Sequence, residues 1–174
     1  GSIAMNNIEK LRKKMPQESC CALITSDINR RYFCGMKSSA GAVLVFPDAA
    51  YLLIDFRYFE KAKEKVTDCE VVRSVKFYSQ LADLLKKHGT EKVYTEAETM
   101  TVAELSVYAE KLDGFKIDST GFLSDAITKL RSVKTAEELK KMQKAQDIAE
   151  AALDNALKNV IKEGATELEV ARAL

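Results

Sequence analysis

The fold of this chain is decided by residues 40–54, Ala40-Gly-Ala-Val-Leu-Val-Phe-Pro-Asp-Ala-Ala-Tyr-Leu-Leu-Ile54. Two apolar runs of strand length, residues 40–46 and 51–54, flank a short loop that contains Pro47 and Asp48. Two strands joined by so short a loop form an antiparallel hairpin. A sheet that contains this hairpin is mixed rather than wholly parallel.

Strand-like and helix-like patterns alternate on both sides of this hairpin. The further strand-like segments are short and apolar and lie at residues 20–25, 69–73, 92–94 and 115–117. Helical patterns lie between them at residues 6–15, 55–66, 81–88, 101–112 and 123–130. Asp55 caps one of these helices, and Thr101 with Glu104 forms a capping box at another. We therefore expect an α/β fold with a mixed β-sheet flanked by helices.

A longer helical pattern begins with a capping box at Thr135 and Glu138. Its apolar stripe runs from Leu139 to Val160, so the helix would be about 39 Å long by helical rise. We therefore expect a domain boundary at residues 131–134. The expected organisation is an expression scar at 1–4, an N-terminal domain at 5–131, and a linker with the first helices of a second domain at 132–174.

Another helix start lies close to the last residue. Gly164 closes the long pattern, and Thr166 with Glu169 forms a new capping box. A helix shorter than about 12 residues is marginal unless it packs against something. We therefore expect the front part of a larger protein, with chemistry beyond Leu174. The apolar stripe on residues 139–160 should then pack on the preceding domain at a non-native angle, or pair with a second copy.

Composition argues against two classes of partner. The 174 residues include 27 basic and 26 acidic side chains, and this net charge of +1 does not suggest a surface for nucleic acid or membrane. No apolar run reaches the roughly 18 residues that cross a bilayer, and no signal peptide follows Met5. The cysteines lack C-x-x-C spacing, which favours buried free thiols in a reducing cytoplasm over a disulfide or metal framework. They are Cys20, Cys21, Cys34 and Cys69.

Catalytic motifs are largely missing. The one histidine, His88, lies in a Lys-Lys-His-Gly helix end, where a cation complements the helix dipole. A histidine-centred metal site or a Ser-His-Asp arrangement would have to use this residue, and no partner lies near it in sequence. The seven glycines form neither a G-x-G-x-x-G nor a phosphate-loop spacing.

Two short segments are unusual. Residues 31–35, Arg-Tyr-Phe-Cys-Gly, precede a small polar turn at 36–39 and suggest a buried aromatic anchor with a conformationally required glycine. At 55–58, Asp-Phe-Arg-Tyr, an arginine lies in the first turn of a helix, where a cation is disfavoured. We expect Arg57 to pair with a carboxylate, and a clamp for a substrate carboxylate is the alternative.

Several segments, taken in chain order, carry a family resemblance. They are Tyr32-Phe-Cys-Gly35, Ser39-Ala-Gly41, Asp55-Phe-Arg57-Tyr58 with Ala62, Leu130-Arg-Ser-Val-Lys134, Glu137-Glu-Leu139, Lys144-Ala145 and Gly164-Ala-Thr-Glu-Leu-Glu-Val-Ala171. In this order they resemble the metallopeptidases of the creatinase, prolidase and aminopeptidase P type. The resemblance implies a creatinase N-terminal-like domain, followed by a long helix that begins a truncated pita-bread catalytic domain.

The resemblance also implies the activity of the complete protein. It would hydrolyse the bond between an N-terminal residue and proline, with water activated by two divalent metal ions, Mn, Co or Zn. Two Asp, one His and two Glu would hold these metals beyond this sequence. No catalytic residue, metal ligand or cofactor is therefore assigned within it. The family likeness further implies a cytoplasmic homodimer that acts on short proline-containing peptides.

Candidate site residues follow from the same likeness. The loop after the Tyr-Phe-x-Gly segment would reach the active-site mouth, so the candidates for substrate-proximal contacts are Lys37, Ser38 and Ser39. Structural roles in the family motifs are expected for Tyr32, Gly35, Asp55, Arg57 and Tyr58. Two alternatives stay open for the complete protein: a creatinase-like hydrolase of another carbon–nitrogen bond, or a binding or scaffold protein without metal ligands.

Overall fold

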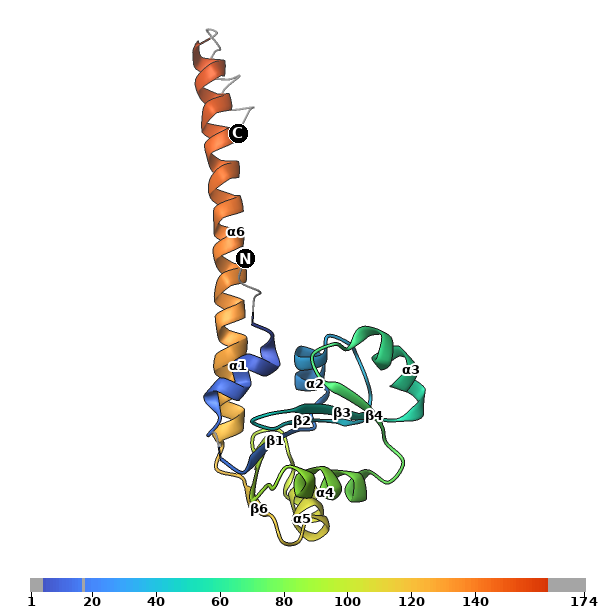
Figure 1. Ribbon diagram of the computed structural model, residues 1–174. Coiled ribbons are helices and arrows are strands. Elements are labelled where there is room, and N and C mark those ends of the chain that lie inside the picture. Colours follow the sequence, from blue (N-terminus) through green and yellow to red (C-terminus); the bar gives the residue numbers. More distant parts are fainter. Residues whose placement is uncertain (1–4, 17, 163–174) are drawn as a thin grey trace. The chain divides into compact units, whose positions relative to one another are not determined.

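The computed structural model describes residues 5–16 and 18–162 (Figure 1). They fall into two compact units, the first ending at Leu130 and the second beginning at Arg131. The strands are β1 (Cys20–Ile24), β2 (Ala42–Val45), β3 (Ala50–Ile54), β4 (Glu70–Arg73), β5 (Lys92–Thr95) and β6 (Lys116–Asp118). The helices are α1 (Asn7–Lys14), α2 (Asp27–Cys34), α3 (Phe56–Lys65), α4 (Phe77–Lys87), α5 (Val102–Lys111) and α6 (Phe122–Lys162).

The strands form one mixed sheet in the order β4-β3-β2-β1-β5-β6. β2 runs antiparallel to β1 and β3, whereas the β1–β5, β3–β4 and β5–β6 pairs are parallel. The hairpin is present as expected: Val45 pairs with Ala50, and the Phe46 amide donates to the Ala49 carbonyl at 2.8 Å. The expected α/β fold with a mixed sheet is confirmed.

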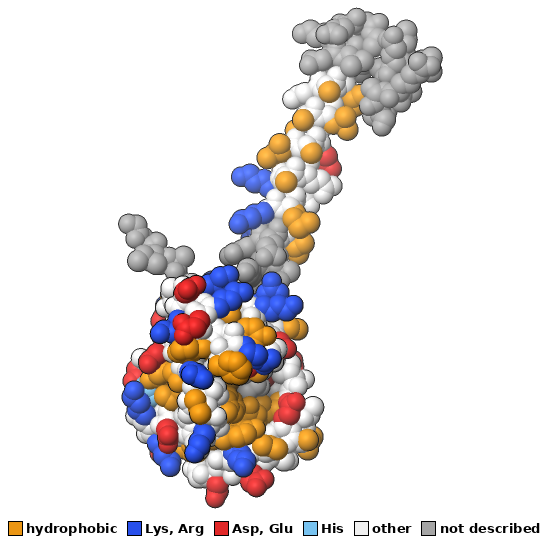
Figure 2. All heavy atoms as spheres, turned by 90° about the vertical axis from the view of Figure 1, so that its right-hand side faces the viewer, with side chains coloured by type: hydrophobic (Ala, Val, Ile, Leu, Met, Phe, Trp, Pro, Cys, Tyr) orange, Lys and Arg blue, Asp and Glu red, His pale blue; other side chains and the backbone are white. Residues whose placement is uncertain are grey.

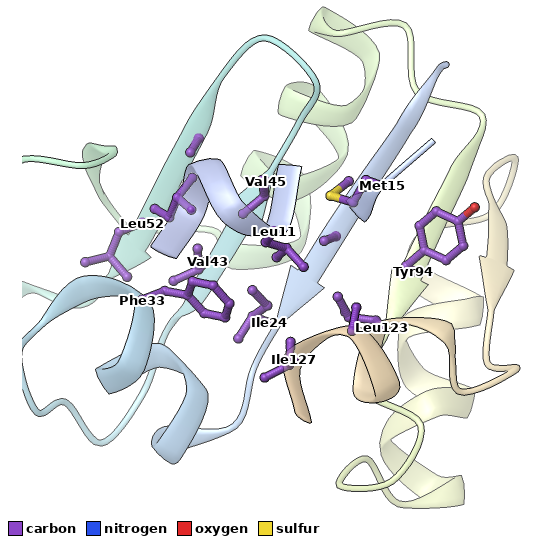
Figure 3. Close-up of a cluster of buried hydrophobic side chains, with 14 of the residues drawn as sticks. Leu11, Met15, Ile24, Phe33, Val43, Val45, Leu52, Tyr94, Leu123 and Ile127 are labelled. Carbon is purple, nitrogen blue, oxygen red and sulfur yellow. The ribbon is translucent and has the colours of Figure 1, made fainter. Parts of the chain in front are cut away.

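Helices cover both faces of this sheet (Figure 1). Successive strand side chains point to opposite faces, so Ile24 and Leu23 enter different buried clusters. Figure 3 shows the first cluster, where Leu11 of α1, Phe33 of α2 and Ile127 of α6 lie over the strands. The second cluster is closed by residues of α4 and by the end of α5, namely Leu81, Leu85 and Leu112. The fully apolar strands are therefore central because both of their faces are buried.

Helix α2 is not among the helices expected from the sequence. The Ser26 hydroxyl caps it by accepting from the Asn29 amide, and Gly35 ends it with a φ of 74°. The aromatic segment at 31–35 therefore lies on a helix, with Phe33 buried in the first cluster. Its cap and its terminal glycine were the available signals, but the eight residues between them carry too few apolar positions to show a helical period.

Helix α6 corrects a second expectation. A brief helix at 123–130 and a separate helix from Thr135 were expected, but α6 runs unbroken from Phe122 to Lys162. No glycine or proline interrupts this stretch, so nothing disrupts its backbone hydrogen-bond ladder. The domain boundary at 131–134 stays a prediction. Residues 1–4 and the capping box at Thr166 and Glu169 lie outside the described residues.

Hydrophobic side chains are exposed along the second unit, as Figure 2 shows. They are Val133, Leu139, Met142, Ile148 and Leu153. The expectation that this stripe packs on another surface stays a prediction. On the face of the first unit in Figure 2, basic and acidic side chains are interspersed. Among the described helices, none is both long enough and apolar enough to span a membrane.

Two glycines with positive φ provide a matched test of the packing before β2. A Cβ on Gly41 (φ 125°) would lie 2.5 Å from the Leu53 carbonyl oxygen, whereas a Cβ on Gly35 (φ 74°) would meet nothing within 4 Å. We expect Gly41→Ala to lower the free energy of unfolding by about 3–5 kcal/mol, through strain and overlap. Gly35→Ala should cost only about 1–2 kcal/mol. Urea denaturation measures both, and equal losses would contradict this packing.

Candidate functional site

A pocket of about 330 Å³ lies where the parallel strands β1 and β5 end. After β1 the chain enters α2, which packs on one face of the sheet, and after β5 it leads to α5 on the other. Such a switch point is where open α/β sheets bind ligands. The pocket is lined by Thr25, Asp27, Arg30, Ser39, Ala40, Gly41, Tyr78, Glu104, Val107 and Tyr108.

The carboxylate of Glu96 lies behind this pocket and holds residues 25–29 in place by hydrogen bonds. Glu96 is 1% exposed and follows β5 directly. Its Oε1 accepts from the Thr25 amide at 2.6 Å and the Ser26 amide at 2.9 Å. Its Oε2 accepts from the Ser26 hydroxyl at 2.7 Å and from Asn29 Nδ2 at 2.6 Å. The positive end of the α2 dipole also favours a negative charge here, so Glu96 joins the end of β5 to the start of α2.

Arg30 is 2% exposed and holds the loop before β2, which also lines the pocket. Its Nε donates to Ser38 Oγ, and its Nη2 donates to the Ser38 carbonyl and to Asp27 Oδ1. Its Nη1 donates to the carbonyls of Thr25 and Gly41. A guanidinium has five N–H donors, and each one has an acceptor here. Arg30 therefore ties the loop before β2 to the end of β1, and no donor remains for an anionic ligand.

The open side of the pocket is rich in hydrogen-bond acceptors. Asp27 and Glu104 contribute carboxylates, and the rings of Tyr78 and Tyr108 lie 5.5 Å apart. Burial, then the charges of Tyr78 and Glu104, raise the pKa of Tyr108 to about 12. Neither tyrosine hydroxyl has a hydrogen-bond partner among the residues described. Carboxylates beside aromatic rings suit a cation or an N–H-rich group better than an anion.

The structure separates the three candidates for contacts near the substrate. Ser38 is buried, with its hydroxyl and its carbonyl both accepting from Arg30. Ser39 is exposed and lines the pocket, and its hydroxyl lies 3.0 Å from the Tyr58 hydroxyl. Lys37 is exposed on the same loop. Lys37 and Ser39 are therefore the side chains of this turn that a ligand can reach.

The family-motif residues form local contacts at the start of α3 and the end of α2. Asp55 caps α3, and its Oδ2 lies 2.7 Å from Arg57 Nη2. Hydrogen bonding to Arg57 lowers the pKa of Asp55. The Arg57 guanidinium also lies 5.6 Å from the centre of the Tyr58 ring. Tyr32 lies edge-on to the ring of Phe33 at 5.0 Å.

His88 has partners that its sequence neighbours do not reveal. It caps the C-terminus of α4, and its ring stacks on Phe46 with centroids 4.2 Å apart. Its Nε2 lies 2.8 Å from the Tyr51 hydroxyl and its Nδ1 lies 3.2 Å from Asp48 Oδ1. The predicted position of His88 at a helix C-terminus is confirmed, and its partners lie 37 and 40 residues away in sequence. Tyr51 is only 4% exposed, so this chain of groups links the hairpin to α4 rather than forming an accessible nucleophile.

Neither Glu96 nor Arg30 was predicted from the sequence. The partners of Glu96 lie 67 to 71 residues away, and the acceptors of Arg30 lie 3 to 11 residues away, mostly in the loops on either side of α2. Glu96 bonds residues up to 71 positions away, and no local period marks such a contact. The only local signal was a polar segment, Thr-Ser-Asp, directly after an apolar strand. Among the described residues, no group of three or more His, Cys, Asp or Glu side chains could hold a metal ion.

Most of this chain is similar in sequence to known proteins. A sequence model of the Creatinase/Prolidase N-terminal domain matches residues 7–133. The uncharacterized peptidase YqhT of Bacillus subtilis is 31% identical over 169 residues, which cover 96% of this chain and 47% of that protein. A solved Xaa-Pro dipeptidase from Bacillus anthracis is 27% identical with a TM-score of 0.65, over 95% of this chain and 46% of that one.

A shorter solved structure matches over most of its own length. The N-terminal domain of the cytoplasmic peptidase PepQ from Mycobacterium tuberculosis H37Rv is 29% identical with a TM-score of 0.58. This match covers 68% of the present chain and 96% of that domain. The chain thus spans about half the length of YqhT and of the Bacillus anthracis dipeptidase.

The buried Glu96 carboxylate can be tested with an isosteric substitution. Glu96→Gln places an NH₂ group where an oxygen now accepts two hydrogen bonds, so buried donors of residues 25–29 lose their acceptor. We expect the free energy of unfolding to fall by about 2–4 kcal/mol. The exposed neighbour Glu98 is the control, and Glu98→Gln should change stability by less than about 0.5 kcal/mol. If both variants lower the free energy of unfolding to a similar extent in urea denaturation, the hydrogen bonds of Glu96 do not stabilise the domain as described.

Proposed function

This chain belongs to the creatinase/prolidase N-terminal domain family, and on that premise we propose that it is the non-catalytic N-terminal domain of a metal-dependent Xaa-Pro peptidase. The complete protein would hydrolyse the bond between an N-terminal residue and proline. The observation that carries this proposal is the extent of the matches. The family model covers residues 7–133, whereas the chain covers under half of YqhT and of the Bacillus anthracis Xaa-Pro dipeptidase.

The described residues do not fit a two-metal centre themselves. Such a centre needs several carboxylate and imidazole ligands converging on two ions. The histidine ring already lies against Tyr51 and Asp48, and Glu96 is saturated by donors from residues 25–29. We therefore assign the metal ligands, and the hydrolytic step itself, to the remainder of the complete protein.

The proposed contribution of this domain is to shape substrate access and to help form a homodimer. Lys37 and Ser39 are the accessible side chains of the turn after α2, and Ser38 anchors that turn through Arg30. The hydrogen bonds of Arg30 keep this loop in one conformation without a ligand. A loop that selects among substrates needs such a fixed conformation. The neighbour PepQ is described as cytoplasmic, and we propose the same compartment for this protein.

The proposal that this domain is non-catalytic can be tested by comparing the isolated chain with the complete protein. With Mn²⁺ or Co²⁺ and an Xaa-Pro dipeptide, we expect the complete protein to release proline and the isolated 174-residue chain to release none. Proline release is measured by chromatography. Turnover by the isolated chain would overturn its non-catalytic role. An inactive complete protein would instead favour a scaffold, and turnover of another carbon–nitrogen bond alone would favour a creatinase-like hydrolase.

The role of the turn is tested in the complete protein with two matched lysine substitutions. We expect Lys37→Ala to raise KM for Xaa-Pro peptides by about 2- to 10-fold with little change in kcat, because the lost contact would stabilise the bound substrate and the transition state equally. Lys61→Ala is the control, since Lys61 is an exposed lysine on the outer side of α3 and belongs to no candidate contact. Equal KM values for the two variants would show that Lys37 does not contact the substrate.

A further inference from the structure

Two tyrosine rings from different helices meet in the pocket at the ends of β1 and β5. Tyr78 lies in the first turn of α4 and Tyr108 in the last turn of α5, and both line the pocket of about 330 Å³. Their ring centres are 5.5 Å apart and their planes meet at 67°, so the rings form a corner rather than a stack. Such a pair presents a ring face as well as a ring edge to its surroundings, and a ring face attracts a cation.

Two carboxylates line the same pocket, and each has one oxygen to spare. Asp27 accepts from Arg30 through Oδ1, and Glu104 accepts from the Thr101 amide through Oε2 at 3.2 Å. Within the part of the chain that the structure describes, Asp27 Oδ2 and Glu104 Oε1 accept no hydrogen bond. Both residues are exposed, so a ligand in the pocket can reach these oxygens.

The charges at the pocket leave a negative balance. Among the described residues that line it, Arg30 is the only cation, and protein acceptors occupy its donors. The carboxylates of Asp27 and Glu104, together with that of Glu96 behind the pocket, outweigh this one guanidinium. The raised pKa of Tyr108, about 12, keeps its hydroxyl neutral at pH 7, so Tyr108 adds an acceptor without adding a charge.

A cation of the protein itself already lies against one of these rings. The Lys111 Nζ atom is 6.0 Å from the centre of the Tyr78 ring. Lys111 lines a neighbouring pocket that shares Tyr78 with the first one, and it does not line the first pocket. The Tyr78 ring is therefore placed where a cation can approach it, and the pocket beside Asp27 and Glu104 has room for a second one.

We propose that this pocket binds the guanidinium group of an arginine side chain, which stacks on a tyrosine ring and donates to the free oxygens of Asp27 and Glu104. A guanidinium is planar, carries five N–H donors and stacks on aromatic rings, whereas an ammonium has only three donors. Two carboxylate oxygens and two tyrosine hydroxyls offer more acceptors than an ammonium can use. The binding site does not depend on the proposed peptidase function, since it requires no turnover.

The test is isothermal titration calorimetry of the purified 174-residue chain with the Nα-acetyl amides of arginine, lysine and citrulline. Citrulline has nearly the shape of arginine but no charge. We expect the arginine probe to bind with a Kd of about 1 mM or tighter. The lysine probe should bind at least about 3-fold more weakly, and the citrulline probe at least about 10-fold more weakly. No binding of the arginine probe, or equal affinity for either of the other two, would overturn the proposal.

Two matched glutamate substitutions and backbone amide NMR locate the site. Glu104→Gln removes the charge but keeps an oxygen for the Thr101 amide, and it should raise the Kd of the arginine probe by about 5- to 10-fold. Glu110→Gln is the control, since Glu110 is exposed on the same helix and does not line the pocket, and it should leave the Kd unchanged. Equal Kd values for the two variants would contradict the proposed contact.

In the unsubstituted chain, the arginine probe should shift the amide signals of residues 25–30, 39–41 and 104–108 most strongly, because these segments surround the pocket. The largest shifts in any other segment would overturn the assignment of the site. This measurement decides the question even if a variant misfolds, and its outcome is independent of whether the complete protein hydrolyses Xaa-Pro peptides.

Discussion

The buried carboxylate of Glu96 is the constraint on which the rest of the domain depends. A charge this far from water is costly unless every acceptor site is used, and four donors from residues 25–29 surround it. Three of these donors belong to the first two residues after β1, so the carboxylate sets where β1 ends and α2 begins. The parallel register between β1 and β5 brings the carboxylate to this place.

Arg30 depends on that arrangement. It lies one turn into α2, so the position of its guanidinium follows from the start of the helix. From there it reaches both ends of the turn before β2, at Ser38 and Gly41. Met36 anchors the start of this loop in the first buried cluster, but the residues that follow it, Lys37, Ser38 and Ser39, have little apolar surface with which to fix their own shape. The saturated arginine supplies the missing contacts, which explains why Ser38 points inward while Lys37 and Ser39 stay accessible.

The same division of roles supports the proposed function, in which this domain guides a substrate without reacting with it. Arg30 and Glu96 are saturated by protein partners, whereas the carboxylates of Asp27 and Glu104 line the pocket.

The sequence by itself determined the features that depend on local contacts. The hairpin at 40–54, the capping box at Thr101 and the mixed sheet follow from periodicity and from turn and cap residues, all of which act within a few positions. Helix α2 was not predicted because it is short and polar. Helix α6 was wrongly predicted as two helices because a capping-box sequence inside a helix resembles a helix start. Only the tertiary structure decided which charged and polar side chains would meet. Glu96 with Thr25 and His88 with Tyr51 are pairs separated by 71 and 37 residues. No sequence period encodes such contacts, because the folding of the intervening sheet brings the partners together.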